Sequence, residues 1–465
     1  MFAHRRSPQR LPMLATGLGL CLGLSLFLGT AQAQTGGRCN DLSNPEPRGI
    51  REPVPLNQGE AVSLDPQSSL QLLVREAVRR SQEVGASRFL AEAAGFDLDE
   101  VRAGRLPQVS LNGFLGASGN QTVGVSSSVN GARATLGVNL SAPLYDFGRL
   151  QSLIDWRTRL ADAAKQGENI SQERVALEVV NTALERQRYR LQSQVYQQQV
   201  RKMGCLVDAL EQIVAADKGR SSELVQARKS LQQAELSRDQ SMALVRQVEI
   251  TLRKFVGEQI SLNDSFVGAL MATPELTEVN RLIERHPEVM RARQEADAQD
   301  SYADAVKAGQ KPQLSWQVSG NGGRSGEQTV RGWSAGVSVS VSLFNGGALE
   351  AASMAAFKRA QSARAGLGQT LLDRQTRAAQ LHDAALTSME RARRYISLLR
   401  DTEKVRQATF QQWSQLGRRS LFDVMSAETD HFSQRVAYVN ALMDSAQSNA
   451  SLRSVGEGLM VWARP

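Results

Sequence analysis

Hydrophobic and polar residues alternate strictly in two stretches of the chain. In residues 333–343 every second residue is apolar and the residues between are serine or glycine, and residues 136–142 follow a similar rule. A period of two is typical of a β-strand with one apolar face. Shorter stretches of this kind occur at 109–111 and 314–318. The pattern therefore predicts four strands in two pairs.

Glycine, serine and asparagine dominate residues 117–133 and 321–331, between the strands of each pair. Such a composition is typical of loops, so both stretches are predicted to connect strands. The run Gly320-Asn321-Gly322-Gly323 is not followed by Lys and Ser or Thr, and it therefore does not fit a phosphate-binding loop.

The rest of the pattern is helical. Residues 150–218 are rich in Gln, Arg, Ala, Glu and Leu, and no proline lies between Pro143 and Pro274 or between Pro312 and Pro465. Apolar residues keep the three-four spacing of a coiled-coil seam at Leu177, Val180, Leu184, Leu191, Val195, Leu206, Leu210 and Ile213. A helix of about 68 residues is roughly 100 Å long, too long for a compact domain. Glycines 219 and 417 are predicted to end two such helices, with shorter helices at 222–256 and 420–455.

The chain is an internal duplication. Four pairs of similar segments recur in the same order, at 82–84 and 287–289, 103–110 and 308–315, 143–148 and 342–347, and 219–222 and 417–420. We therefore expect a first structural repeat at 67–270 and a second, with a C-terminal segment, at 271–465. Each repeat should hold a helix, a strand pair, a long helix, a hairpin turn and a returning helix.

The first 33 residues resemble a secretory signal peptide. Arg5, Arg6 and Arg10 precede an uncharged stretch at 11–30, and Ala-Gln-Ala follows at 31–33 as a cleavage site. A transmembrane anchor is the alternative. Residues 34–66 would then form an extended N-terminal segment. Cleavage would lower the net charge from +8 to about +5, too mild to indicate a nucleic-acid partner.

The composition excludes one class of membrane protein but allows another. The mean hydropathy of −0.32 excludes a polytopic helical membrane protein, but the strands of a membrane β-barrel are only half apolar. After cleavage two cysteines would remain, Cys39 and Cys205. In an oxidising compartment they can form a disulfide, and two free thiols are the alternative.

Four strands cannot close a barrel by themselves, because about eight are needed to enclose even a filled interior. A four-stranded sheet with open edges is not tolerated in lipid. Closure must therefore come from identical copies: two would give eight strands and a plugged interior, and three would give twelve around a lumen lined by Ser, Gly and Asn. A soluble sandwich with one wet face is the alternative reading of the strands.

The duplicated motifs resemble those of the TolC-type outer-membrane efflux and secretion channels. They are Pro-Leu-Tyr-Asp-Phe-Gly at 143–148, Ser-Leu-Phe-Asn-Gly-Gly at 342–347, and the Gly-Arg turns. The resemblance implies an α+β, mainly α protomer of a homotrimer, with a twelve-stranded transmembrane β-barrel, four strands per chain, continued by a periplasmic α-helical barrel. It places the protein in the outer membrane of a Gram-negative bacterium.

The same resemblance implies partners. A periplasmic membrane-fusion adaptor would dock at the helical tip and connect the channel to an inner-membrane transporter. Gly-Arg-Ser-Ser-Glu-Leu-Val-Gln-Ala at 219–227 is most similar to the type I secretion branch, which implies an ABC transporter and export of RTX-type proteins or adhesins. The alternative is a drug or small-molecule efflux channel served by an RND pump.

By resemblance, the two hairpin turns are the functional sites. The docking residues would be Gly219, Arg220, Ser221, Gly417, Arg418 and Arg419. Glycine allows left-handed backbone at both turns, and the arginines can donate to partner carboxylates. An ordinary helix corner is the alternative.

The periplasmic gate would consist of Glu223 and Asp423 with Arg419, which we expect to pair with acids of the neighbouring helix pair. Three copies of each acid would form a negatively charged constriction. The family gate has a second acid in the second hairpin, where this chain has Ser426.

No catalytic, cofactor-binding or metal-binding residue is predicted, because the remaining histidines lack metal-ligand spacing and no nucleophile motif occurs. Trp316 and Trp333 are expected at membrane-interface height, in contact with outer-membrane lipid, and ordinary packing is the alternative. The rival class is a periplasmic coiled-coil adaptor or structural rod. Such a protein would share the long helices but would not need duplicated strand pairs.

Overall fold

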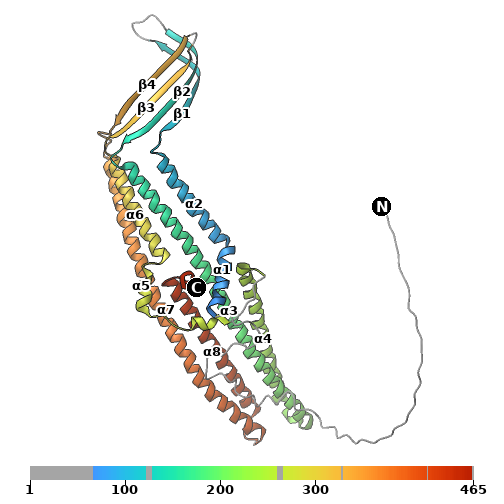
Figure 1. Ribbon diagram of the computed structural model, residues 1–465. Helices are drawn as coiled ribbons and strands as arrows, with labels where there is room; N and C mark the ends of the chain where they lie inside the picture. The colour runs from blue at the N-terminus through green and yellow to red at the C-terminus, as the bar shows by residue number, and fades with distance from the viewer. Residues whose placement is uncertain (1–65, 122–127, 259–264, 326–327, 416, 463–465) are drawn as a thin grey trace, which may run out of the picture. The chain divides into compact units, whose positions relative to one another are not determined.

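The computed structural model describes residues 66–121, 128–258, 265–325, 328–415 and 417–462 (Figure 1). The predicted signal peptide, the N-terminal extended segment and Cys39 lie outside these residues. In chain order the elements of the first half are α1 (Pro66–Arg80), α2 (Gln82–Ala103), β1 (Gln108–Gln121), β2 (Ser128–Tyr145), α3 (Arg149–Ala216), the short 3-10 helix η2 (Lys218–Arg220), α4 (Ser221–Val256) and η3 (Ser265–Leu270). The second half contains α5 (Leu276–Ile283), α6 (Pro287–Ala308), β3 (Gln313–Ser325), β4 (Gln328–Ser340), α7 (Ala348–Ser414), α8 (Leu421–Val455) and α9 (Leu459–Trp462).

The two halves repeat the same elements with nearly the same lengths. Helices α2 and α6 both have 22 residues, and α3 and α7 have 68 and 67. Both long helices begin after a glycine in left-handed conformation, with φ of 85° at Gly148 and 84° at Gly347. These φ values favour glycine because a Cβ would be strained there. The junction motifs that carried the resemblance are thus the N-terminal caps of the long helices.

The side chain two residues before each of these glycines stabilises the start of its helix. In the first half the Asp146 carboxylate accepts hydrogen bonds from the backbone N–H groups of Gly148 at 3.1 Å and Leu150 at 2.6 Å. In the second half Asn345 accepts one from Leu349 at 3.4 Å. These bonds satisfy donors that a helix leaves unpaired at its N-terminus.

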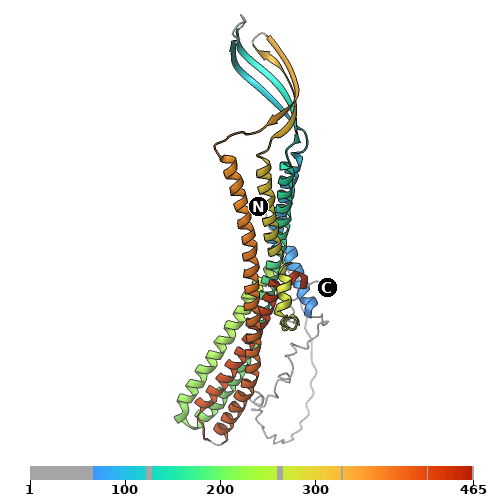
Figure 2. The same ribbon diagram turned by 90° about the vertical axis from the view of Figure 1, so that its left-hand side faces the viewer.

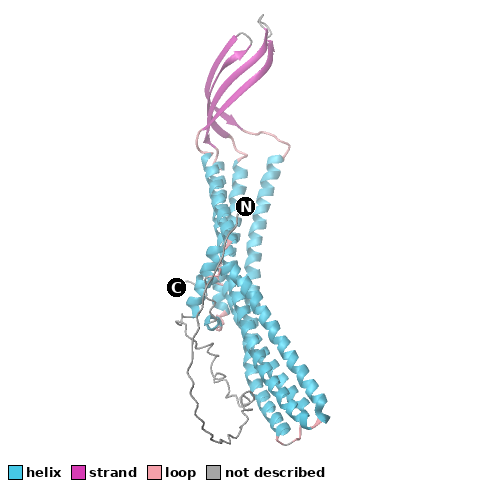
Figure 3. Ribbon diagram, turned by 90° about the vertical axis from the view of Figure 1, so that its right-hand side faces the viewer, coloured by secondary structure: helices cyan, strands magenta, loops and turns pink. Residues whose placement is uncertain are grey.

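The four strands form one antiparallel sheet in the order β1-β2-β3-β4, beyond one end of the long helices (Figure 3). The ladder between β2 and β3 joins the two halves, with Leu140 opposite Val318. Strands β1 and β4 are the edges of the sheet. In the part nearer the helices, the strands alternate between an apolar face and a face of Ser, Asn, Gln and Gly, as the sequence predicts. Phe114 of β1 is an exception, because it lies on the polar face opposite Thr135.

The predicted loops at 117–133 and 321–331 were wrong in their extent. Strand β1 continues to Gln121, β2 starts at Ser128, and β3 runs through the glycine run to Ser325. Glycine is required inside this sheet at Gly323, where a Cβ would collide with the backbone of Ala134 and Thr135 in β2. The alternating pattern also predicted too long a last strand, because β4 ends at Ser340 rather than near Leu343.

Helix α3 is the centre of the helical part and packs against α2, α4, α6 and α8, while α7 packs against α6 and α8 (Figure 2). The coiled-coil seam predicted from the sequence is buried at Val180, Leu184, Val195, Leu206 and Leu210. The main core lies where α1, α3, α4, α8 and α9 meet. There the buried Glu173 carboxylate accepts hydrogen bonds from the N–H groups of Leu459 and Met460, which fixes α9 against α3.

None of the described helices is both long enough and apolar enough to cross a membrane.

Candidate functional site: the two helical hairpin turns

The first hairpin turn is a short 3-10 helix between α3 and α4. The Asp217 carboxylate accepts a hydrogen bond from the Gly219 N–H at 2.9 Å, and Arg220 lies 3.6 Å from the Glu223 carboxylate in the first turn of α4. Ser221 is the first residue of α4. The left-handed backbone expected at Gly219 does not occur, because the 3-10 turn makes the corner without it.

The second hairpin turn is longer and differently built. Gly417 is left-handed, with a φ of 59°. Gln412 in α7 stabilises the turn through two hydrogen bonds. Its backbone carbonyl accepts one from the Arg418 N–H at 3.0 Å, and its side-chain oxygen accepts one from Arg419 Nε at 3.2 Å. Ser420 then caps α8: its hydroxyl accepts from the Asp423 N–H, and the Asp423 carboxylate accepts from the Ser420 N–H.

The acids expected at the gate therefore have partners within their own hairpins. Glu223 is paired with Arg220, and Asp423 belongs to the α8 cap. In the described part of the chain Arg419 makes no ion pair with an acid. The expected pairing of Arg419 with the neighbouring helix pair is not formed within this chain and stays a prediction for an assembly.

A hollow of about 140 Å³ connects the two hairpins at the start of α4 and α8. It is lined by Ser222, Glu223, Gln226, Leu421, Phe422 and Met425. Glu223 Oε2 is buried in this region and has no hydrogen-bond partner among the described residues. Beside it, Phe422 is 65% exposed. The hollow thus combines an acceptor with an exposed aromatic side chain.

An apolar cluster next to this hollow supports both turns. Helix α7 contributes the partly buried Phe410 and Trp413 to it. Its buried members come from α3, α4 and α8: Met203, Leu206, Val207, Leu210, Ala227, Leu421, Val424 and Met425. Because the two hairpins share this cluster, a shift of one turn must repack the other.

An ionic cluster farther along α7 and α8 was not predicted from the sequence. Arg406 donates to Glu403 on its own helix at 2.6 Å and to Glu428 on α8 at 3.1 Å. Thr402 and His431 are 3.1 Å apart across the same interface. The sequence does show polar residues three positions apart on each helix, at 403 and 406 and at 428 and 431, with a further polar residue at 402. This spacing could have indicated a polar contact between the two helices.

Burial controls the protonation of this cluster. It raises the pKa of Glu428 against the opposing effect of Arg406, and it lowers the pKa of His431 to about 4, with Arg406 acting in the same direction. His431 is therefore neutral at ordinary pH. The Arg406–Glu428 pair crosses from α7 to α8 and ties the two helices together just beyond the second hairpin.

The family profile decides the identity of the chain. The profile described as outer membrane efflux protein matches residues 73–258 and 279–456, one segment in each half. The chain belongs to the outer membrane efflux protein family. The protein is accordingly an outer-membrane protein.

Solved structures of outer-membrane channels share the fold of this efflux family member. CusC matches with a TM-score of 0.75 and 18% identity over 87% of this chain and 96% of that chain. The outer membrane protein VceC of Vibrio cholerae gives 0.72 and 17% over 84% and 96%, and the CmeC channel of Campylobacter jejuni gives 0.71 and 14% over 84% and 86%. No curated protein sequence matches the chain. The mainly helical α+β fold is confirmed.

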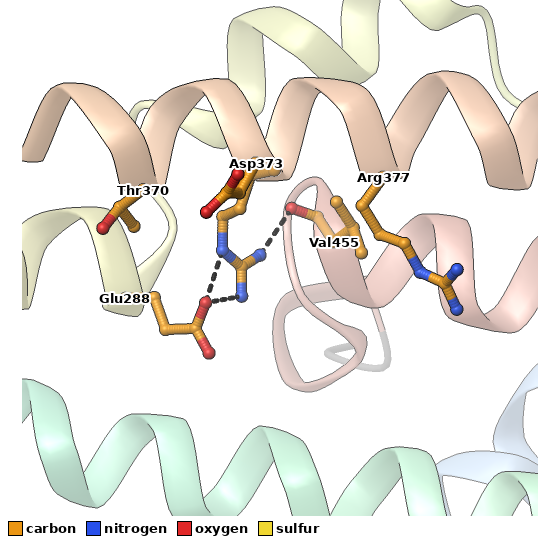
Figure 4. A pocket seen from close by; sticks show the side chains of 6 residues that line it. Glu288, Thr370, Asp373, Arg377 and Val455 are labelled. Atoms are coloured by element: carbon orange, nitrogen blue, oxygen red, sulfur yellow. Dashed lines mark hydrogen bonds and ion pairs between the residues drawn. The ribbon is translucent and has the colours of Figure 1, made fainter.

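A second hollow in this efflux family member, of about 380 Å³, lies beside α7 (Figure 4). Arg374 spans it, donating to Glu288 Oε2 at 2.7 Å and to the Val455 carbonyl at 2.9 Å, and so joins α6, α7 and the end of α8. Thr370, Asp373 and Arg377 complete the lining. We interpret Arg374 as a structural tie between helices.

Cys205 is disulfide-bonded in the structure. Its expected partner, Cys39, lies outside the described residues, so the pairing of these two stays a prediction. Among the described residues no group of three or more His, Cys, Asp and Glu side chains could hold a metal ion.

Proposed function

We propose that three copies of the chain close into a channel through the outer membrane and form the exit duct of a tripartite export system. The observation that supports this most strongly is the open sheet. Its apolar face carries Val109, Leu111, Leu136, Val337 and Val339, and each of these side chains is more than half exposed. Both edges, β1 and β4, lack a partner strand within the sheet.

Closure by identical copies removes both edges, because β4 of one copy can pair with β1 of the next. Three sheets give twelve strands, enough for an open lumen. The polar face would then line the pore. Its hydroxyls already bond to each other across the strands, Ser315 to Ser338 and Ser319 to Ser334, each at 2.8 Å.

The helical part supports the same assembly. Large apolar side chains are exposed on three helices, at Phe89, Leu90 and Phe96 of α2, Leu236 and Ile250 of α4, and Leu372, Leu386 and Val405 of α7. On a protein in water such rows mark contact surfaces. Neighbouring copies would cover them and continue the barrel as a periplasmic helical cylinder.

The hairpin turns are the proposed docking site for a periplasmic adaptor. Arg220, Arg418 and Arg419 provide donors at the turns, and the hollow beside Glu223 and Phe422 can receive a side chain of the partner. The adaptor would connect the duct to an inner-membrane transporter.

The exported substrate is either a protein or a small molecule. The sequence at the first turn favours type I secretion of RTX-type proteins or adhesins with an ABC transporter. The description of the family as efflux proteins favours the alternative, a drug or small-molecule channel served by an RND pump. Deleting the gene separates the two. Loss of a secreted protein with unchanged drug susceptibility supports type I secretion, and the reverse pattern supports efflux.

Purified protein tests the channel itself. We expect a heat-modifiable trimer on gel electrophoresis and discrete conductance steps in planar bilayers. A monomer that forms no pore in bilayers, or recovery as a soluble periplasmic protein, would refute the proposal.

A further inference from the structure

Two arginines lie on the apolar face of the sheet. Val318 of β3 pairs with Ala335 of β4, and steps of two along each strand from this apolar pair lead to Arg324 and Arg331. Arg133 of β2, at the same end, pairs with Ser325 and so belongs to the opposite, polar face. The alternation of the strands therefore directs one charge into the predicted lumen and two charges outward, to the side that faces lipid.

Arg324 lies next to the end of β3 and Arg331 near the start of β4. This end of the two strands is the one away from the helices (Figure 1). Arg324 comes ten residues after Leu314, the first apolar residue of β3. A strand rises about 3.3 Å per residue, and we take its tilt from the barrel axis as about 40°. Ten residues then span roughly 25 Å along the axis, which is the height of the apolar band of a membrane barrel. Arg324 therefore reaches the outer interface rather than the hydrocarbon.

The energetics agree with this height. An arginine on the lipid face is strongly unfavourable at the bilayer midplane but costs little near the interface. Trp333 lies two residues from Arg331 on the same face and is 83% exposed. A tryptophan below the arginines fits the aromatic belt at a membrane interface.

Neither arginine has an acidic partner in the described part of the chain. Strands β1 to β4 contain no Asp or Glu, and neither Arg324 nor Arg331 takes part in an ion pair there. Glu327 lies outside the described residues. Both side chains are exposed and available to a ligand.

The two side chains are close enough to share a ligand. Arg324 pairs with Thr329, two residues before Arg331, so the arginines are diagonal neighbours across the ladder. Diagonal positions are about 7–8 Å apart, within reach of long side chains. Guanidinium groups bind phosphate oxygens in a bidentate manner.

We propose that Arg324 and Arg331 form a binding site for the phosphate groups of outer-leaflet lipids, one site per copy of the chain. This inference rests on the proposed barrel, which puts the apolar face toward lipid. The ligand class is a phosphorylated glycolipid of the outer leaflet, whose phosphates lie at the height of the arginines while its acyl chains contact the apolar rows below. The site would anchor the trimer in a fixed lipid shell.

The test uses the purified full-length trimer in detergent with Mg²⁺ chelated, and bisphosphorylated lipid A as the probe. The variant Arg324→Gln/Arg331→Gln should bind lipid A at least about tenfold more weakly than the unmodified protein in native mass spectrometry. Arg133→Gln is the control, because it removes an arginine at the same rim from the opposite face, and it should bind lipid A as tightly as the unmodified protein does. Dephosphorylated lipid A should bind the unmodified protein and the double variant alike.

Equal lipid A affinity in the double variant and the unmodified protein would overturn the site, as would an equal loss in Arg133→Gln. Trimer formation on gels and conductance in bilayers should be unchanged in the double variant, so these readouts separate the two proposals. If the unmodified protein itself forms neither trimer nor pore, the proposed barrel fails. If it forms both and the arginines make no difference to lipid binding, only this inference fails.

Discussion

At the scale of residues, buried charge fixes how α7 and α8 lie together. The Glu428 side chain is 4% exposed and Arg406 is 12% exposed, so the pair is largely removed from water. A buried ion pair contributes little compared with an apolar contact, but removing one partner leaves the other charge buried alone. The pair therefore makes the packing of these helices specific to one register.

We predict that Arg406→Met destabilises the protein strongly. It would leave Glu428 buried without its cation, a loss of about 3–5 kcal/mol in comparable cases. The midpoint temperature for the loss of helical circular dichroism should fall by several degrees. Arg394→Met is the control, because Arg394 pairs with Glu390 on the surface and should melt almost unchanged. Equal melting of the two variants would show that the Arg406–Glu428 pair is not important for stability.

The buried histidines predict an acid-sensitive fold. Burial lowers the pKa of His286 to about 3, with Arg374 acting in the same direction, and lowers that of His431 to about 4. Between these values and about 6.5 the unfolded chain binds protons that the folded chain does not, so stability falls as the pH falls. Each histidine contributes a slope of up to about 1.4 kcal/mol per pH unit in that window. Glu173 and Glu428 act in the opposite sense, because burial raises their pKa values.

His286→Asn isolates one of these contributions. His286 caps α6 by accepting a hydrogen bond from the Glu288 N–H at 3.2 Å, and asparagine can replace that acceptor without titrating. Melting temperatures from pH 7 to pH 4 should fall less steeply in this variant than in the unmodified protein. Parallel curves would mean that His286 is not held neutral in the folded state.

These residue pairs could not be predicted from the sequence. Arg406 and Glu428 are 22 residues apart on opposite sides of a turn, so their contact depends on the length of that turn and on the register of two helices. The spacing of polar residues on each helix was visible, but it did not show which residues face each other. Cys205 is disulfide-bonded, and its pairing with Cys39 stays a prediction.

At the scale of elements, the long helices were predictable and the strand ends were not. The absence of proline and the helix-forming composition predicted a helix of about 68 residues, and α3 has 68. The parts of the strands farther from the helices contain too few apolar residues to show alternation, because both of their faces carry Gly, Ser and Asn. Backbone pairing with the neighbouring strand, which no local pattern reveals, extends them.

The hairpin turns carry a prediction about gating. In an assembled channel, Arg419→Ala/Asp423→Ala should raise the single-channel conductance in planar bilayers, because it removes the charges proposed to hold the tip closed. Asp423 also caps α8, so the matched control is Ser420→Ala, which removes the cap but keeps both charges. An increase in the control as large as that in the double variant would attribute the effect to the helix end, and unchanged conductance in the double variant would refute the gate.

At the scale of the whole molecule, the open sheet explains why this chain needs copies of itself. The number of strands, their alternation and the duplication were readable from the sequence, and together they predicted closure by identical neighbours. The structure adds the register, which assigns each strand residue to one face. It places Trp316 and Trp333 on the apolar face, as their expected role at the membrane interface requires.

The central claim is that three sheets close with their polar faces around a pore, and adjacent residues of β4 test it most directly. Val337 lies on the apolar face and Ser338 on the polar face. In single channels exposed to a membrane-impermeant thiol reagent, Ser338→Cys should lose current in three discrete steps, while Val337→Cys and the unmodified protein should keep it. Block of Val337→Cys in place of Ser338→Cys, or a number of steps other than three, would contradict the account.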